Sequence, residues 1–173
     1  GIATYTHYLK SLIQNSKAQL LDTRKTTPNF RIAEKWAVEI GGGMNHRFGL
    51  YDMIMLKDNH IDFAGSVAQA LKSIKSYLKK SKKKLKIEIE VRSLQELREV
   101  IEVGGVDRIM LDNMMPSQIR QGIAMIDGKY ETEASGGITE MSISEIANTG
   151  VDYISVGALT HSYKSLDMSL KAI

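Results

Sequence analysis

Charged residues follow two of the short apolar segments near the start of the sequence. Arg24 and Lys25 come after the first segment, and Lys57 ends the second. Arginine suits planar, bidentate binding of carboxylates and phosphates, whereas lysine supplies a point charge. Together with His46 and Arg47, which lie between the two segments, these residues predict the cationic side of a site for anionic ligands.

Carboxylates stand in the next two apolar segments. Glu90 lies in the third segment and Asp112 ends the fourth. Carboxylate oxygens bind sugar hydroxyls or Mg²⁺, directly or through its waters. Glu88 and Glu90 alternate along a strand and should both point inward, and the alternative for Glu88 is a structural ion pair with Lys57. We therefore expect Glu90 and Asp112 to form the centre of the site.

Two short glycine motifs end the last two apolar segments. They are Ser135, Gly136 and Gly137 in one loop and Val156, Gly157 and Ala158 in the other. Exposed backbone N–H groups in such turns favour phosphate, and β/α barrels often bind phosphate in their last two βα loops. Either motif alone is a weak signal, but at the ends of consecutive strands they predict the phosphate side of the same site.

Strand and helix patterns alternate along the chain. Strands are predicted at 19–23, 52–57, 86–91, 108–113, 130–135 and 153–158, and helices at 31–40, 63–78, 94–103, 116–126 and 141–148. This alternation is typical of parallel β/α units with right-handed crossovers. A complete eightfold barrel needs about 200–250 residues. The chain has 173, which predicts an incomplete, open, TIM-like β/α barrel of about six strands. The carboxyl ends of its strands meet at one mouth, so all these residues should share one site.

Helical spacing also places three large apolar residues on one stripe. They are Ile32, Trp36 and Ile40, within the helix predicted at 31–40. Such a stripe is the usual signature of an amphipathic helix.

Composition favours a single domain spanning residues 1–173. The chain has 43% hydrophobic residues and no cysteine, which excludes disordered and disulfide-stapled classes. No apolar run approaches the roughly 18 residues of a membrane span, and we expect a cytoplasmic protein. A net charge of +3 is too small to imply nucleic acid. Eight lysines at 72–86 are best explained as a solvated helix face, with a non-catalytic anion-binding module as the alternative.

Long motifs in this order resemble one enzyme family. They are DTRKTTP at 22–28, EKWAVEIGGGMNHRFGLYDMIMLKDNHI at 34–61, IEIEV at 87–91, IMLDNM at 109–114, EASGGI at 133–138 and GVDYISVGALTHS at 150–162. The sequence closely resembles quinolinate phosphoribosyltransferase, also called nicotinate-nucleotide pyrophosphorylase (carboxylating), over nearly the whole chain. The part resembled is the barrel domain of that family.

The resemblance implies a reaction and a set of residues. Phosphoribosyl would pass from phosphoribosyl pyrophosphate to quinolinate with decarboxylation, giving nicotinate mononucleotide, CO₂ and pyrophosphate in NAD biosynthesis, with Mg²⁺ as cofactor. Catalysis would fall to Lys57, Glu90 and Asp112, with Glu90 and Asp112 holding the metal, in part through water. Substrate binding would involve Thr23, Arg24, Lys25, His46, Arg47, Lys57, Glu90, Asp112, Ser135, Gly136, Gly137, Val156, Gly157 and Ala158.

The resemblance also implies partners beyond this domain. The family carries a preceding α+β domain, absent from these residues, which closes the site and supplies an arginine across a dimer. We therefore expect a homodimer or higher homo-oligomer, and weak or no turnover from this domain alone. An alternative is the molybdenum-transport-associated paralogue, which shares the barrel and uses another acceptor.

Overall fold

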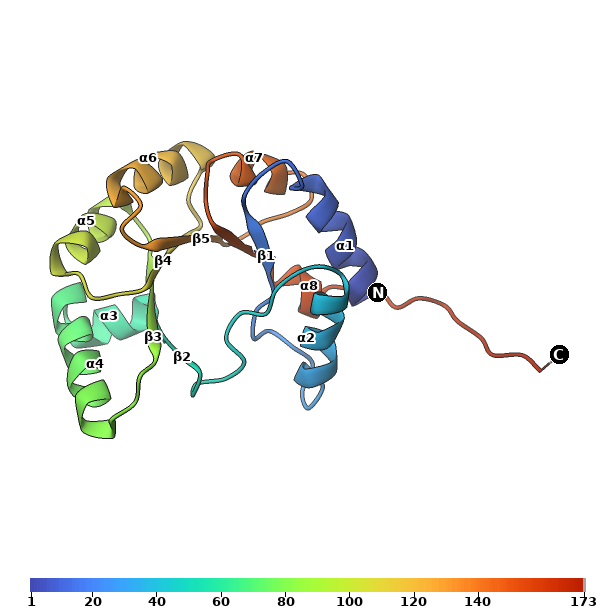
Figure 1. Cartoon of the computed structure of the whole chain (residues 1–173), viewed down its shortest axis with the longest axis horizontal. Helices are drawn as coiled ribbons and strands as arrows, with labels where there is room; N and C mark the ends of the chain where they lie inside the picture. Colours follow the sequence, from blue (N-terminus) through green and yellow to red (C-terminus); the bar gives the residue numbers. More distant parts are fainter. Residues whose placement is uncertain (173) are drawn as a thin grey trace.

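The computed structural model describes residues 1–172 as one open parallel β/α barrel (Figure 1). The strands are β1 (Gln19–Leu21), β2 (Met53–Leu56), β3 (Lys86–Val91), β4 (Arg108–Asp112), β5 (Glu131–Ser135) and β6 (Tyr153–Ser155). The helices are α1 (Ile2–Leu12), α2 (Arg31–Ile40), α3 (Asp58–Ala64), α4 (Val67–Ser81), α5 (Leu94–Val103), α6 (Pro116–Ile126), α7 (Ile143–Ala147) and α8 (Ala158–His161). The fold class expected from the sequence is confirmed.

The barrel is open between β1 and β2. The strand order is β1-β6-β5-β4-β3-β2, so these two strands are the edges of one six-stranded sheet. A single parallel bridge joins Leu21 of β1 to Met44, and the segment that follows crosses the opening before β2 (Figure 1). This crossing segment carries His46 and Arg47, and brings Arg47 to the barrel mouth with His46 buried beneath it.

The strand register divides the core into two faces. Glu88 pairs with Arg108, and Met110 pairs with both Glu90 and Glu133, so these side chains share the inner face. The alternate residues of the same strands, such as Ile89 and Leu111, are fully buried on the helix side. The apolar core therefore lies between sheet and helices, and the barrel interior is polar.

Several predicted boundaries are wrong by a few residues. The helix predicted at 63–78 is two helices, because Gly65 adopts a left-handed φ of 88° and the Ser66 hydroxyl caps α4 by accepting from the Gln69 N–H. The strand predicted at 153–158 ends at Ser155, and its last residue instead begins α8. The strand predicted at 19–23 ends at Leu21, because the chain turns there toward α2. The other strand and helix predictions hold to within two residues at each end.

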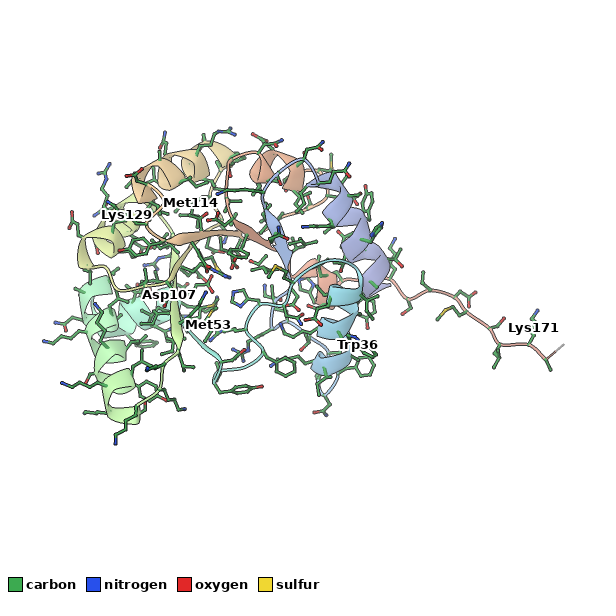
Figure 2. All side chains as sticks on the ribbon, in the orientation of Figure 1. Trp36, Met53, Asp107, Met114, Lys129 and Lys171 are labelled. Atoms are coloured by element: carbon green, nitrogen blue, oxygen red, sulfur yellow. The ribbon has the colours of Figure 1, made fainter. Side chains whose placement is uncertain are left out.

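The apolar stripe of α2 is present but faces outward. Ile32, Trp36 and Ile40 are 75%, 64% and 65% exposed. Figure 2 shows Trp36 on the outer side of α2. The same helix instead buries Glu34 and Lys35, each 1% exposed, against the barrel. This is the reverse of the usual amphipathic arrangement.

The eight lysines of residues 72–86 are all exposed, as expected for a solvated helix face and its exit loop. No helix among the described residues combines the length and the apolar character that crossing a membrane requires.

Candidate active site at the barrel mouth

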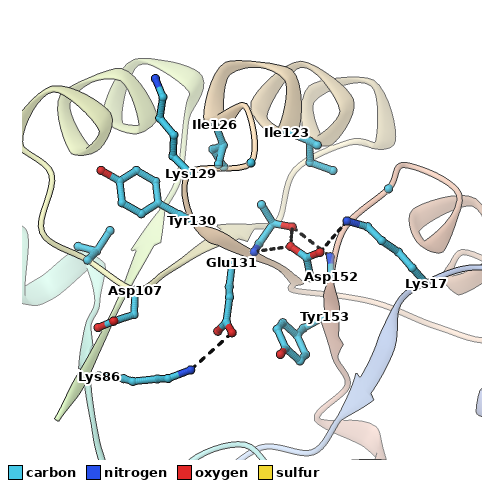
Figure 3. Close-up of a pocket in the computed structure, with 14 residues that line it drawn as sticks. Lys17, Lys86, Asp107, Ile123, Ile126, Lys129, Tyr130, Glu131, Asp152 and Tyr153 are labelled. Atoms are coloured by element: carbon cyan, nitrogen blue, oxygen red, sulfur yellow. Dashed lines mark hydrogen bonds and ion pairs between the residues drawn. The ribbon is translucent and has the colours of Figure 1, made fainter.

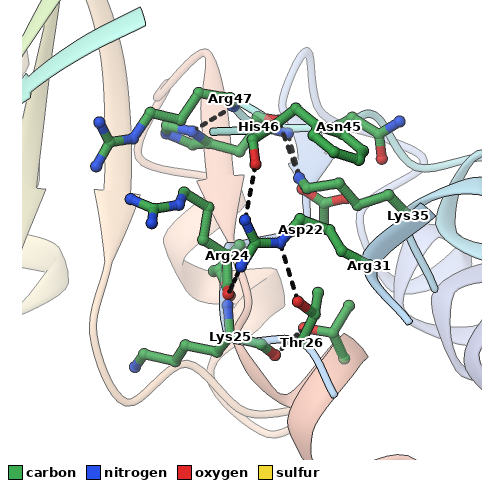
Figure 4. Close-up of polar contacts among 12 residues, drawn as sticks. Asp22, Arg24, Lys25, Thr26, Arg31, Lys35, Asn45, His46 and Arg47 are labelled. Atoms are coloured by element: carbon green, nitrogen blue, oxygen red, sulfur yellow. Dashed lines mark hydrogen bonds and ion pairs between the residues drawn. The ribbon is translucent and has the colours of Figure 1, made fainter. Parts of the chain in front are cut away.

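Two loops supply the cationic side of the mouth. The loop after β1 carries half-buried Arg24 and exposed Lys25, and the crossing segment carries half-buried Arg47. Burial lowers the pKa of Arg47, and the charge of Arg24 lowers it further. The side chains of Arg24, Lys25 and Arg47 point to the same side, away from α2 (Figure 4). Half-buried Thr23 braces the first loop by accepting from the Lys25 N–H at 3.1 Å.

Lys57 and Glu90 form the centre of the mouth. The Lys57 ammonium lies 2.6 Å from a carboxylate oxygen of Glu90, whose side chain is 8% exposed against 46% for Lys57. The alternative pairing of Lys57 with Glu88 is wrong, because Glu88 lies one layer deeper and contacts His46. At the end of β4, Asp112 accepts from the Asn113 side-chain amide at 2.6 Å. Two carboxylates and one lysine thus stand at or near the carboxyl ends of β2, β3 and β4.

The first glycine loop exposes its backbone. Gly136 has a φ of 91°, and a side-chain carbon there would lie 2.3 Å from Asn113 Oδ1 and 2.8 Å from the Asn113 backbone nitrogen. Gly137 has a φ of 59° with no atom within 4 Å of that position. Only glycine fits the first position, and the second offers open space over the backbone. Half-buried Ser135 ends β5 immediately before them.

The second glycine loop borders the cationic side. A side-chain carbon on Gly157 would lie 2.9 Å from His161 Nε2 and 3.4 Å from the Lys25 side chain. The Thr160 hydroxyl donates to the Lys25 carbonyl at 2.7 Å. Val156 is buried beneath the loop, and Ala158 is half-buried at the start of α8. An anion over Gly157 would therefore lie within reach of Lys25.

His46 lies below the mouth rather than in it. Its Nε2 is 3.0 Å from a Glu88 oxygen and 3.4 Å from a Glu133 oxygen, and both carboxylates are fully buried. Burial lowers the pKa of His46, but Glu133 and Glu88 outweigh burial and raise it to about 9. Burial and the charge of Glu133 raise the pKa of Glu88 to about 7, whereas His46 and Arg108 hold that of Glu133 below its usual range. The cluster therefore shares its protons, and its titration belongs to the group.

These three side chains also have the composition of a metal site. Their ligand atoms lie within 4.8 Å of one another. However, in the neutral ring the backbone N–H of Arg47 donates to His46 Nδ1 at 2.7 Å and the ring proton lies on Nε2, and in the charged ring Nε2 carries a proton as well. A metal would need Nε2, so the geometry favours a proton there.

Arg108 balances the charge of the buried glutamates. It donates to Glu133 at 3.1 Å and to Glu131 at 3.0 and 3.1 Å, and its guanidinium stacks over the Tyr153 ring at 3.8 Å. Our sequence interpretation missed Arg108 and Glu133. The alternation of Glu131 and Glu133 on a predicted strand, the same pattern as Glu88 and Glu90, was the available signal.

A cavity of about 700 Å³ opens at the opposite end of the barrel (Figure 3). Four of its charged lining residues form two ion pairs, with Lys17 2.6 Å from Asp152 and Lys86 3.5 Å from Glu131. Active sites of β/α barrels lie at the carboxyl ends of the strands. We therefore assign the chemistry to the mouth and a structural role to these ion pairs.

Comparison with known proteins agrees with this geometry. Residues 2–171 match the family described as quinolinate phosphoribosyl transferase, C-terminal domain. The chain belongs to this family. It is 47% identical over 185 residues to quinolinate phosphoribosyltransferase [decarboxylating] 2, mitochondrial, of Nicotiana glauca, covering 99% of this chain and 52% of the relative. It is 46% identical over 170 residues to the probable nicotinate-nucleotide pyrophosphorylase [carboxylating] of Bacillus subtilis, covering 98% and 57%.

The chain is also similar to solved structures of nicotinate-nucleotide pyrophosphorylases. The nicotinate-nucleotide pyrophosphorylase of Francisella tularensis superposes with a TM-score of 0.91 at 45% identity, covering 98% of this chain and 59% of that one. The chain thus spans about half the length of the curated relatives it matches.

Proposed function

We propose that this domain binds phosphoribosyl pyrophosphate and quinolinate at the barrel mouth. It there serves the transfer of phosphoribosyl to the quinolinate nitrogen, with loss of CO₂ and pyrophosphate, to give nicotinate mononucleotide. One observation carries the proposal. Arg24, Lys25 and Arg47 point to one side of a mouth that also carries exposed glycine backbone and the carboxylates Glu90 and Asp112. A dicarboxylate needs the cationic side, and a sugar phosphate needs the glycine backbone and the carboxylates.

The cationic side suits the acceptor. Arg24 and Arg47 come from different loops, so each guanidinium can take one carboxylate of a planar diacid. Lys25, beside Gly157, lies between the acceptor and the phosphate loop. A monocarboxylate would leave one guanidinium without a partner in a half-buried site, and is therefore expected to bind less well.

The central residues suit the transfer step. Departure of pyrophosphate builds positive charge on the ribose, and the Glu90 carboxylate stabilises that charge. The Lys57 ammonium lies 2.6 Å from Glu90, and the Lys57 side chain is 46% exposed. The ammonium can therefore also contact the departing diphosphate. Once the ring nitrogen carries the ribose, its positive charge stabilises the electron pair left on the adjacent ring carbon when the bond to the carboxylate breaks and CO₂ leaves. A proton from solvent water then binds to that carbon, and the role of the domain in this step is to hold the ring.

Asp112 and Glu90 fit Mg²⁺ of the kind that is held by one or two carboxylates and substrate phosphates. Asp112 is the better placed, because one Glu90 oxygen already lies 2.6 Å from the Lys57 ammonium, whereas among residues 1–172 the Asp112 side chain accepts only from the neutral amide of Asn113. Bound there, the ion would neutralise charge on the diphosphate.

Calorimetric titration of this chain with quinolinate, and separately with nicotinate, tests the proposal. We expect quinolinate to bind more tightly, and Arg47→Met to remove most of the preference. Arg98→Met, on the exposed face of α5, is the matched control and should bind as the parent chain does. Equal binding of both acids by the parent chain would contradict the assignment and favour the paralogue with another acceptor. The homo-oligomer, the cytoplasmic location and weak turnover by this domain stay predictions.

A further inference from the structure

Helix α2 buries two charged residues beside Val38 against the barrel, and exposes its large apolar side chains to the solvent. The fully buried residues Glu34 and Lys35 lie on its inner side together with half-buried Arg31. Charged residues are seldom buried unless they are paired or hydrogen-bonded. Their partners therefore indicate what this inner face does.

Lys35 and Asp22 form a buried ion pair that hydrogen-bonds to the backbone of His46. The Lys35 ammonium donates to Asp22 at 2.5 Å and to the His46 carbonyl at 2.9 Å. The same Asp22 oxygen accepts from the His46 N–H at 2.8 Å. Asp22 directly precedes the Arg24 loop, so the pair fastens the crossing segment to the end of β1.

Arg31 spans the same two segments through its guanidinium. Its Nη2 donates to the Arg24 carbonyl at 3.1 Å, its Nε to the Thr26 hydroxyl at 3.0 Å, and its Nη1 to the Phe48 carbonyl at 3.0 Å (Figure 4). Glu34 adds a bond by accepting from the Thr27 N–H at 3.0 Å. One helix thus hydrogen-bonds to the loop that holds Arg24 and to the segment that holds Arg47.

A device of this kind is needed because the two loops repel each other. Arg24 lowers the pKa of Arg47, which means that their charges oppose close approach. Burial raises the pKa of Asp22 and lowers that of Lys35, so the ion pair between them is held against a desolvation cost. Buried ion pairs are often no better for stability than apolar residues of similar volume. Their use here is to fix geometry.

We propose that Arg31, Lys35 and Asp22 are positioning residues that set the spacing between Arg24 and Arg47, and hence the fit to a planar dicarboxylate. The inference rests on the proposed function for its ligand, and on the hydrogen bonds alone for the joining of the two loops.

The first test removes the guanidinium and measures amide hydrogen exchange. In Arg31→Met we expect faster exchange at Thr27 and His46 together, about tenfold or more, although the two lie on different loops. Arg98→Met on α5 should leave both unchanged. Unchanged exchange in Arg31→Met would overturn the joining of the loops by Arg31, whatever the domain binds.

The second test measures quinolinate and ribose 5-phosphate by calorimetry. Arg31→Met should bind quinolinate about tenfold more weakly and ribose 5-phosphate within about twofold, because the glycine loops are not held by Arg31. The double variant Asp22→Asn/Lys35→Met removes both buried charges at once and should show the same selective loss.

The outcomes separate the two claims. Failure of the parent chain to bind quinolinate would overturn the proposed function and the role of the spacing, while the exchange measurement would still decide whether α2 joins the loops. Faster exchange with unchanged quinolinate binding would overturn the positioning role. An equal loss for both ligands would show general unfolding of the mouth rather than a set spacing.

Discussion

Replacing Glu88 with glutamine should stabilise the domain at neutral pH, although it removes a contact. Glu88 is fully buried, and burial together with Glu133 raises its pKa from 4.5 to about 7. A group whose pKa is raised by folding contributes stability below its unfolded pKa and loses it as the pH rises through the folded pKa. The stability that protonated Glu88 contributes is therefore lost progressively between pH 4.5 and pH 7, and above pH 7 the loss is complete.

The size of the effect follows from the same values. A rise from 4.5 to about 7 corresponds to about 3 kcal/mol at pH 8; this value already includes the attraction of His46, and it holds while Glu133 and His46 keep their charges. Near pH 4 the protonated carboxyl resembles an amide, and the two chains should be about equally stable. The free energy of unfolding of Glu88→Gln minus that of the parent should therefore grow with pH.

Urea denaturation followed by circular dichroism at pH 4.5, 6 and 8 measures this difference. Glu99→Gln, an exposed carboxylate on α5, should show a pH-independent difference near zero. If Glu88→Gln were instead less stable than the parent, and increasingly so toward pH 8, Glu88 would be ionised in the fold and its attraction to His46 would dominate. The account of a shared proton in the cluster would then be wrong.

Two further substitutions test the strand ends and the barrel interior. Gly136→Ala should destabilise the fold by about 1–3 kcal/mol and weaken ribose 5-phosphate binding, because the φ of Gly136 is 91° and the new carbon meets Asn113. The control is Gly128→Ala, where φ is 68° but the space around the new carbon is open. It should cost only the backbone strain of about 1 kcal/mol, and thermal melts measure both losses. Arg108→Met should cost about 3–5 kcal/mol in urea denaturation, because it leaves Glu133 buried without its guanidinium partner; a loss below about 1 kcal/mol would show that Glu133 is neutral in the fold.

The residues of the mouth could be predicted from the sequence because each one is placed by its position at the end of its own strand. Parallel strands bring their carboxyl ends to one edge, so finding Lys57 or Asp112 at a strand end is enough to place it there. The glycine loops follow the same rule, because glycine is the residue that most readily adopts the left-handed conformation found at Gly136. The open barrel followed from counting strands against the chain length.

The supporting contacts could not be predicted in this way. Lys35 binds Asp22, thirteen positions away, and His46 meets Glu133 from across the barrel. Helical periodicity even pointed the wrong way, since the apolar stripe around Trp36 marked the face of α2 that lies outside. Periodicity records which residues share a face, but not whether that face meets the core of this domain or the solvent.

Two polar clusters, Asp22 with Lys35 and Glu88 with Glu133, fix different parts of His46. Asp22 and Lys35 hold the backbone of His46 from the helix side, while Glu88 and Glu133 hold its ring from inside the barrel. His46 is thereby fixed through both its backbone and its ring, which also fixes the backbone of Arg47, the next residue. Within residues 1–172 the Arg47 guanidinium itself makes one long hydrogen bond, 3.3 Å to the Met53 carbonyl. A binding arginine held through its neighbour keeps its remaining donors for the ligand. This arrangement explains why a histidine that turns away from the mouth stands beside the arginine that faces it.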